Sequence, residues 1–448
     1  MTILDNYAIP RNLTALSPML VQGEGIYLID EEGRRYIDGS GGSSLVCNIG
    51  HGVKEIARVM AEQAGQLAYN PTHCSISRPF VELGTKLAAR APGNLTYVFF
   101  LNGGSEAVET SIKFARQYQL QKGQPSKFMV VSRWQSYHGN TMGALSVSGH
   151  TQRRRRHAPT LNQNCHIPPA YCYRCYFDLT YPECGLKCAK ILETAIRQEG
   201  PENVSAFIAE PVVGASLGAV SAPVGYFEII RRICDRYEVL FVADEVMTGF
   251  GRTGKNFAIE HWDAVPDIIA TGKGMGSGYA PLGAVIMSPD ILDLMVDRGA
   301  DFVGGHTYSG HLLSCRVGTA VLDYMQHYRL VERAAERGNY LLEGLQTLGD
   351  FKMVGDVRGK GLMAGIEFVE DKATKRPFAV ELNVAKQVMD AAMEKGLIVF
   401  PGNGSVDGQM GDHILIGPPL IIEEKQIEEM VLILREAIEE VEQNLDLP

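Results

Sequence analysis

Two short segments of the 448-residue chain carry side chains that could act together in catalysis. Asp244 and Glu245 follow the apolar run Val239 to Ala243, and Lys273 lies in the loop Thr271-Gly272-Lys273-Gly274. A desolvated lysine loses its proton more easily, as Schiff-base chemistry requires, and the glycines leave room for a bulky adduct. A carboxylate at the end of a buried strand needs a partner, such as a pyridinium nitrogen. Capping of the next element is an alternative role for Asp244.

A third segment, Asn102-Gly103-Gly104-Ser105, could bind an anion, because it follows an apolar run and precedes a helical pattern. Backbone N–H groups at a helix start, together with the helix dipole, favour a phosphate, and Ser105 could add its hydroxyl. The same residues are also typical of an ordinary turn and helix cap. A nucleotide-binding P-loop is excluded around Lys273, since the spacing Gly-x-x-x-x-Gly-Lys-Ser/Thr is absent.

A cysteine cluster forms a separate candidate site. Cys172, Cys175, Cys184 and Cys188 follow the pattern C-x2-C-x8-C-x3-C, and the other five cysteines are scattered. Four soft ligands at this spacing are compatible with a closed, structural zinc site. Alternatively, these are ordinary buried cysteines in a segment made apolar by its aromatic residues. The spacing leaves both interpretations open.

Short apolar runs that alternate with helical patterns should position these motifs. We predict strands at Tyr97 to Leu101, Phe128 to Ser132, Ala206 to Ala209, Val239 to Ala243, Ile268 to Ala270 and Gly283 to Met287. Their consecutive apolar residues suit a sheet that is covered on both faces, and the helical pattern at 227–237 gives a strand-helix-strand order. This indicates an α/β fold with a mainly parallel sheet. Ligands of such sheets lie beyond the carboxyl ends of the strands, where the three motifs fall.

The two ends of the chain indicate a smaller second domain. Gly25 to Asp38 has the pattern of a small hairpin, with its turn at residues 31–33, and an apolar stripe from Ile427 to Val441 predicts a final amphipathic helix. We therefore expect a large α/β domain with helices on its sheet, at 56–325, and a smaller α+β domain at 326–448. Residues 1–55 should join the smaller one.

Composition excludes several classes of protein. Hydrophobic residues make up 45% and charged residues 21%, as in ordinary globular proteins, and the net charge of -10 argues against a nucleic-acid surface. The basic run Arg153 to Arg156 is most simply a solvated loop. Met1 to Leu20 lack a signal-peptide pattern, and no apolar stretch is long enough to span a membrane. We therefore expect a cytoplasmic protein with reduced cysteines.

Taken together, these motifs resemble the class III aminotransferases, the ornithine, 4-aminobutyrate and omega-amine transaminase group of fold type I pyridoxal-phosphate enzymes. The resemblance runs from about Gly23 to the final helix. Its most specific part is Asp244-Glu245-Val246-Met247-Thr248-Gly249-Phe250-Gly251-Arg252-Thr253-Gly254, followed by Pro266-Asp267 and then Lys273.

The resemblance implies pyridoxal 5'-phosphate as the cofactor. Lys273 would form the Schiff base, Asp244 would pair with the ring nitrogen, and Glu210 would lie beside the ring hydroxyl and the substrate. Tyr137 would stack on the ring, although a packed core aromatic is an alternative. The implied cofactor-binding residues are Gly104, Ser105, Tyr137, His138, Asp244, Val246, Lys273 and Thr307. The threonine would reach the phosphate from a neighbouring subunit, which implies a homodimer with shared active sites, or a tetramer built from it.

The implied function is transfer of an amino group from an amine or omega-amino acid to a 2-oxo acid. A racemase or aminomutase on the same fold is the alternative, and a non-catalytic protein that kept the fold is a third. Two positions depart from the family pattern. Leu415 stands where many relatives have a carboxylate-binding arginine, and Met247 replaces a glutamine. An arginine from Arg153 to Arg156 could serve instead, or the donor could lack a carboxylate.

Overall fold

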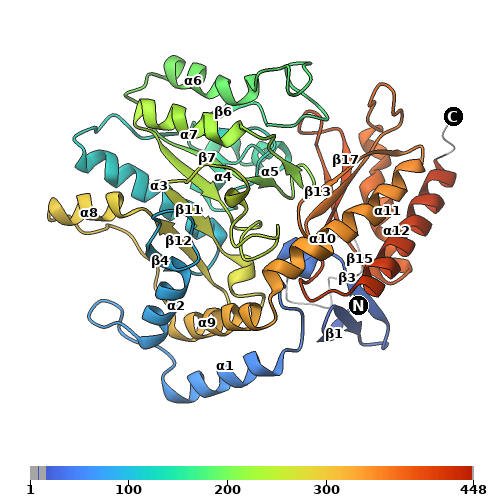
Figure 1. The fold of residues 1–448 in the computed structure, drawn as a ribbon, viewed down its shortest axis with the longest axis horizontal. Coiled ribbons are helices and arrows are strands. Elements are labelled where there is room, and N and C mark those ends of the chain that lie inside the picture. The colour runs from blue at the N-terminus through green and yellow to red at the C-terminus, as the bar shows by residue number, and fades with distance from the viewer. Residues whose placement is uncertain (1–8, 10–16, 446–448) are drawn as a thin grey trace.

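The computed structural model describes residue 9 and residues 17–445, and a seven-stranded sheet forms its centre (Figure 1). In spatial order the strands are β4 (Tyr97–Leu101), β12 (Gly283–Met287), β11 (Ile268–Thr271), β10 (Leu240–Asp244), β7 (Val204–Ala209), β5 (Met129–Arg133) and β6 (Cys165–Ile167). The five strands from β11 to β6 run parallel, and β12 is antiparallel to both of its neighbours. The predicted mainly parallel sheet is therefore confirmed.

Helices cover both faces of this sheet because its strands present apolar side chains on each side. Leu240 and Val242 of β10 belong to the apolar cluster of α3 (Gly104–Gln121) and α8 (Pro289–Asp297). Phe241 and Ala243 point the other way, into the cluster of α6 (Lys187–Glu199) and α7 (Tyr226–Tyr237). The consecutive apolar residues of the sequence are thus explained by burial on two sides.

Shorter elements complete this part of the fold. A group of three contacting helices lies along the lower edge of the molecule in Figure 1: α1 (Lys54–Gln66), α2 (Arg78–Ala88) and α9 (Leu312–His327). Along the chain, two short helices, α4 (Met142–Val147) and α5 (Thr151–Arg155), connect β5 to β6. A two-stranded hairpin of β8 (Val212–Val213) and β9 (Val220–Ser221) follows β7.

The C-terminal part adds a second, antiparallel sheet. Its strands, in spatial order, are β13 (Val354–Gly359), β14 (Ala364–Phe368), β17 (Asp412–Ile416) and β16 (Phe400–Asn403). The accompanying helices are α10 (Leu330–Gln346), α11 (Val384–Glu394) and α12 (Glu424–Asn444). The predicted final helix is confirmed, and Ile427, Leu434 and Val441 of its apolar stripe are buried. None of the described helices is long and apolar enough to cross a membrane.

The two ends of the chain meet in a third sheet, of order β1-β2-β3-β15. Its strands are β1 (Leu20–Glu24), β2 (Tyr27–Asp30), β3 (Arg35–Asp38) and β15 (Leu397–Ile398). The antiparallel pair of β2 and β3 is the predicted hairpin, and β15 lies parallel to β3. The boundaries proposed for the domains stay a prediction.

One glycine fixes the distance between α10 and the C-terminal sheet. A Cβ atom at Gly338 would lie 2.2 Å from the carbonyl carbon of Gly361, and a Cβ at Gly361 would lie 2.4 Å from that of Thr253. Backbone is therefore packed on backbone from α10 to the segment that carries Asp244. Such contacts cannot relax by a rotamer change.

We predict that Gly338→Ala lowers the free energy of unfolding by about 1–3 kcal/mol, because the added methyl group must displace backbone. Gly65 provides the control, since it lies in α1 and a Cβ there would have no atom within 4 Å. Gly65→Ala should leave stability equal or slightly raised. Apparent melting temperatures of the two variants test this, and equal values would contradict the packing described.

Candidate active site

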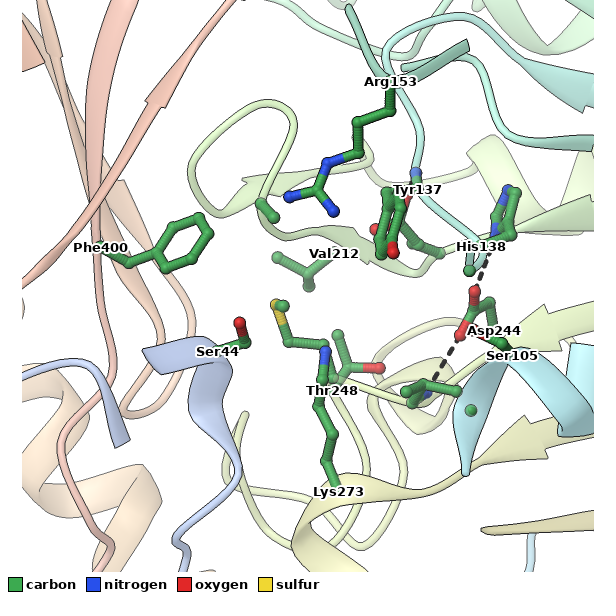
Figure 2. Close-up of a pocket in the computed structure, with 16 residues that line it drawn as sticks. Ser44, Ser105, Tyr137, His138, Arg153, Val212, Asp244, Thr248, Lys273 and Phe400 are labelled. Carbon is green, nitrogen blue, oxygen red and sulfur yellow. Dashed lines mark hydrogen bonds and ion pairs between the residues drawn. The ribbon is translucent and has the colours of Figure 1, made fainter. Parts of the chain in front are cut away.

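A cavity opens at the carboxyl ends of β4, β10 and β11, where the sequence placed its three motifs (Figure 2). Its walls come from both major sheets and from the N-terminal segment. The lining residues are Ser44, Gly104, Ser105, Tyr137, His138, Gly139, Arg153, Glu210, Val212, Ala215, Asp244, Val246, Met247, Thr248, Lys273 and Phe400. All the predicted cofactor and catalytic residues lie here except Thr307.

Asp244 is the last residue of β10, and its side chain is 3% exposed. One carboxylate oxygen lies 2.7 Å from Nδ1 of His138, and the backbone N–H of Val246 donates to the other at 3.1 Å. The Val246 bond is the local capping role that the sequence allowed. The carboxylate nevertheless lines the cavity, where it can accept a further hydrogen bond from a bound ligand.

Glycines bring the three strand ends together. A Cβ at Gly104 would lie 2.5 Å from Cγ1 of Val246, and one at Gly272 would lie 3.3 Å from the backbone nitrogen of Gly104. Gly274 packs against Asn48, at 2.3 Å from a built Cβ to Nδ2. The glycines beside Lys273 therefore allow close packing of neighbouring segments. For Gly274, packing against Asn48 explains the glycine, and the room that the loop leaves for an adduct on Lys273 stays a prediction.

The start of α3 is free to bind an anion. Its N-cap is Gly103, so the segment does cap the helix, as the alternative had it, but no side chain caps the backbone N–H groups of the first turn. Ser105 Oγ instead accepts the backbone N–H of Asn140 at 3.0 Å. Gly139 closes over it, because a Cβ there would lie 2.6 Å from Ser105 Oγ, and its φ of 139° favours glycine. N–H groups in the first turn of α3 can therefore bind a phosphate.

Lys273 has the properties of a nucleophilic amine. It stands at the start of a short turn with φ of 39°, directly after β11. Burial lowers its pKa to about 8, and the charge of Arg153 acts in the same direction, whereas Asp244 and Glu210 oppose the shift. About a tenth of the amines of a lysine with this pKa are neutral at pH 7, far more than for a lysine at its ordinary pKa of 10.5.

Glu210 and Tyr137 both line the cavity and are joined by a hydrogen bond. Glu210 follows β7, and its Oε2 accepts the backbone N–H of Tyr137 at 3.2 Å. Burial raises the pKa of Glu210. The ring of Tyr137 is half-buried and faces the cavity, with Cζ of Arg153 4.4 Å from its centroid. The alternative of a packed core aromatic was therefore wrong.

Arg252, in the same motif as Asp244, holds distant parts of the chain together. Its fully buried guanidinium donates to the carbonyl oxygens of Leu362 at 2.9 Å and Pro418 at 2.5 Å. It also donates to Oδ1 of Asn48 at 2.8 Å, and Asn48 Nδ2 donates to the carbonyl of Phe250. This side chain joins the N-terminal segment, the central sheet and the C-terminal part.

Comparison with known families decides what this site belongs to. The family model for aminotransferase class-III matches residues 8–438. The chain is a class III aminotransferase. It is 38% identical to the uncharacterized aminotransferase YodT of Bacillus subtilis, over 99% of each chain. It is 34% identical to the putrescine–pyruvate aminotransferase of Pseudomonas aeruginosa, over 94% of this chain and 90% of that protein.

A solved structure gives the same result for the fold. The omega transaminase of Pseudomonas jessenii in complex with PMP superposes with a TM-score of 0.89 and 32% identity. The alignment covers 95% of this chain and 93% of that chain. The predictions of the family and of the fold class are therefore confirmed.

Class III aminotransferases use pyridoxal phosphate, and the residues of this cavity fit it. The uncapped start of α3 suits the phosphate, and the carboxylate of Asp244 suits a protonated ring nitrogen. The side chains of Tyr137 and Val246 both line the cavity, and Lys273 supplies the amine. One further polar atom, Nε2 of His138, is buried without a hydrogen-bond partner among the described residues.

Thr307 lies apart from the rest of the predicted site. It is exposed in the loop before α9, and its carbonyl oxygen accepts the hydroxyl of Tyr69 at 2.5 Å. It does not line the cavity of its own chain. Its predicted contact with the phosphate would therefore have to be made in a second copy of the aminotransferase.

The predicted zinc site is not supported by the structure. Zn–S bonds of about 2.3 Å require the sulfur atoms of a tetrahedral site to lie about 3.8 Å apart. No three of Cys172, Cys175, Cys184 and Cys188 have their sulfur atoms within 4.8 Å of one another. Burial raises the pKa of the Cys172 thiol and raises that of Cys188 to about 11, and the charge of the neighbouring cysteines acts in the same direction on both.

Side-chain contacts hold the cysteine segment without a metal. The hydroxyl of Tyr171 and the guanidinium of Arg174 both bond to the buried carboxylate of Glu367 in β14, and Lys375 Nζ donates to the carbonyl of Tyr173 at 2.7 Å. These contacts tie the segment to β14 and to the loop that carries Lys375.

Among the described residues, the group whose ligand atoms do lie within 4.8 Å is Asp38, Cys47 and His51. Asp38 already accepts N–H groups of Ser40 and Gly42 and lies 2.9 Å from Nε2 of His51. Burial, with the charge of Asp38, raises the pKa of the Cys47 thiol to about 12. The carboxylate of Asp38 already has hydrogen-bond partners, and the Cys47 thiol is held in its protonated form. We therefore infer no metal at this group.

Several lining residues were not predicted from the sequence. Ser44 and Phe400 come from the N-terminal segment and β16, and Val212 and Ala215 come from the β8 hairpin. Arg153 was predicted only as one member of a basic run. No local pattern marks these positions, because tertiary packing alone brings them to the cavity.

The depressed pKa of Lys273 gives a prediction about pH. In cofactor-free protein, about half of the Lys273 amines should be neutral at pH 8, against about 0.3% for a lysine at its ordinary pKa of 10.5. A lowered lysine pKa makes the neutral amine available at a lower pH. The rate at which the protein captures the cofactor should therefore rise with pH to a plateau, with a midpoint near pH 8. Stopped-flow absorbance measures this rate, and a midpoint above about 9.5 would contradict the assignment.

Proposed function

We propose that this aminotransferase transfers an amino group from a carboxylate-free amine, or an amine remote from its carboxylate, to a 2-oxo acid. The observation that carries the proposal is the convergence of Lys273, Asp244 and the uncapped start of α3 on one cavity. An amine, a carboxylate and an anion site in this arrangement match the three ends of pyridoxal phosphate. When bound, the cofactor withdraws electrons from the substrate carbon next to nitrogen.

Each residue then has a distinct task. Asp244 keeps a proton on the ring nitrogen, which maintains that electron withdrawal, and the pair it makes with His138 fixes its orientation. The Nζ amine of Lys273 would act as the base that removes a proton from the substrate carbon and as the acid that returns it. Glu210, Tyr137 and Val246 line the cavity and would hold the ring, Glu210 at its hydroxyl and the other two at its faces. Water would release the carbonyl product, and the amino group retained in the site would pass to the acceptor by the same chemistry in reverse.

The preference for a donor without a neighbouring carboxylate rests on Leu415. This residue is completely buried in β17, directly across from Phe400 of β16, whose side chain lines the cavity. An arginine here would lie beside the cavity, because directly opposed residues share a face of the sheet. With leucine the wall is apolar. The relative named putrescine–pyruvate aminotransferase likewise pairs a diamine with a 2-oxo acid in its name.

The racemase or aminomutase alternative gains no support from the family or from the named relatives, which are aminotransferases and transaminases. A screen of amine donors with pyruvate and 2-oxoglutarate, followed by initial-rate kinetics, tests the proposed reaction. Parallel lines in double-reciprocal plots are expected for two half-reactions. Turnover of a single amino acid without any 2-oxo acid would favour the isomerase.

We further propose a cytoplasmic homodimer in which Thr307 of the partner subunit completes the phosphate site. The exposure of Thr307 and its absence from the cavity of its own chain support this arrangement. Mixing Lys273→Ala chains with Thr307→Ala chains tests it. Mixed dimers would contain one site with both native residues, so activity above that of either variant alone is expected.

Lys273→Ala should abolish turnover, since no other lysine lines the cavity among the described residues. The phosphate and ring contacts remain, so the cofactor should still bind, but reversibly. Dialysis followed by absorbance spectroscopy measures this, with Lys113→Ala, an exposed change on α3, as the matched control. Near-normal activity of Lys273→Ala would show that another group is the nucleophile.

Asp244→Asn should lower turnover by several orders of magnitude, because a neutral amide cannot hold the ring nitrogen protonated. Cofactor affinity should fall only moderately, since the phosphate site is untouched. Single-turnover kinetics and cofactor titration separate the two effects, with the exposed Asp293→Asn in α8 as control. A rate close to that of wild type would show that Asp244 acts only as a capping residue and does not protonate the ring nitrogen.

A further inference from the structure

Arg153 is a cationic side chain in the cavity with no role in the scheme above. It comes from α5, and its guanidinium points into the cavity, over the ring of Tyr137 and toward Phe400 (Figure 2). The basic run that contains it was interpreted as a solvated loop. A loop is wrong for Arg153, Arg154 and Arg155, which lie in α5. Arg153 and Arg154 are half-buried, whereas Arg155 and Arg156 are exposed.

Arg153 has no acidic partner among the described residues. Its guanidinium makes no ion pair and no hydrogen bond there, and its one polar contact is the face of Tyr137. The neighbouring arginines are engaged: Arg154 donates to the carbonyl of Ser148 at 2.6 Å, and Arg358 pairs with Glu367 at 2.9 Å. A half-buried guanidinium that faces a cavity without a counter-charge is suited to an anionic ligand.

The cofactor phosphate does not account for this charge. That group belongs at the start of α3, where Gly104 and Ser105 lie, and Figure 2 shows Arg153 toward the Phe400 wall, away from Ser105. Arg153 also lowers the pKa of Lys273, so its charge acts on the reacting amine. An anion bound to Arg153 would therefore lie near the substrate carbon at which Lys273 moves a proton.

The helix that carries Arg153 is anchored on both sides. Arg154 contacts the imidazole of His166, and Arg155 Nη1 donates to Oε1 of Gln409 at 3.4 Å. Thr151 is packed on Gly408, where a Cβ would lie 2.2 Å from Thr151 Oγ1. The backbone of α5 is therefore fixed, and the long side chain of Arg153 can move between the Tyr137 face and a ligand.

We propose that Arg153 binds the carboxylate of the 2-oxo acid acceptor and thereby selects 2-oxo monocarboxylates. This inference rests on the function proposed above and names the acceptor class of the same cavity. Among the described lining residues, the cationic side chains are Lys273, which is the nucleophile, and Arg153. The remaining wall, at Phe400, Val212 and Met247, is apolar. Arg153 can therefore bind one carboxylate of the acceptor, and no cationic lining residue is left to bind a second. With an amine donor that has no carboxylate, Arg153 stays over Tyr137.

The test compares Arg153→Ala and Arg153→Lys with Arg156→Ala, which makes the same change in charge at an exposed position. Loss of a charge-assisted bidentate contact should raise KM for pyruvate about 10–100-fold in Arg153→Ala, with a smaller rise in Arg153→Lys. In Arg153→Ala the KM for the uncharged acceptor butanal should rise much less than the KM for pyruvate, and Arg156→Ala should leave both within about twofold of wild type. Melting temperatures identify any variant that fails to fold.

A measurement without turnover accompanies the kinetics. Propionate, which carries a carboxylate but cannot react, should bind the wild-type holoenzyme and Arg156→Ala in calorimetric titrations, and at least tenfold more weakly to Arg153→Ala. Wild-type kcat/KM should be higher for pyruvate than for 2-oxoglutarate. A pyruvate KM in Arg153→Ala within twofold of wild type would overturn the proposal, and so would a preference for 2-oxoglutarate.

These outcomes are distinguishable from failure of the proposed function. If wild-type protein transfers no amino group between any donor and acceptor, the proposed function is wrong, and propionate binding still tests whether Arg153 holds a carboxylate. If wild type is active and Arg153→Ala is unchanged, only the role of Arg153 is wrong.

Discussion

The active site depends on the close approach of three strand ends, which glycine alone permits. Side chains at Gly104 or Gly272 would separate α3 from Val246 and from the turn that carries Lys273. With these glycines, an anion site, a carboxylate and an amine from three non-adjacent parts of the sequence share one cavity. The sheet supplies the direction of each strand, and the glycines set the distances. Loss of these contacts would leave the chemical groups intact but misplaced.

Much of this arrangement could be predicted from the sequence, because the signals are local. Strands buried on two faces leave consecutive apolar residues, and β4 and β12 have the bounds predicted. The antiparallel C-terminal sheet was not predicted, since its strands are short and interrupted by glycine and proline, as in β16. Arg153, Ser44 and Phe400 reach the cavity through contacts between distant segments. A single sequence has no local pattern that records such contacts.

The cysteine segment shows how a spacing pattern can mislead. The intervals between Cys172 and Cys188 match those of zinc ligands, but the structure orders the segment through Tyr171, Arg174 and their shared partner Glu367. These partners lie far away in the sequence, so the intervals alone could not reveal them. Burial is the largest cause of the raised pKa of Cys188. The spacing of cysteines in the sequence therefore shows which possible ligands are present. Whether their sulfur atoms can meet at one metal ion depends on the tertiary structure.

The bonds of Arg252 have a consequence for the order in which the newly made chain can mature. Its acceptors include the carbonyls of Leu362 and Pro418, which are translated long after the strands of the central sheet. Until those residues emerge, Asn48 is the acceptor available to this buried cation, and the motif that contains Asp244 is not fully secured. A nascent chain can thus assemble its central sheet early, while competence to hold the cofactor waits until Pro418 has been made. Synthesis itself would delay premature loading of an incomplete enzyme.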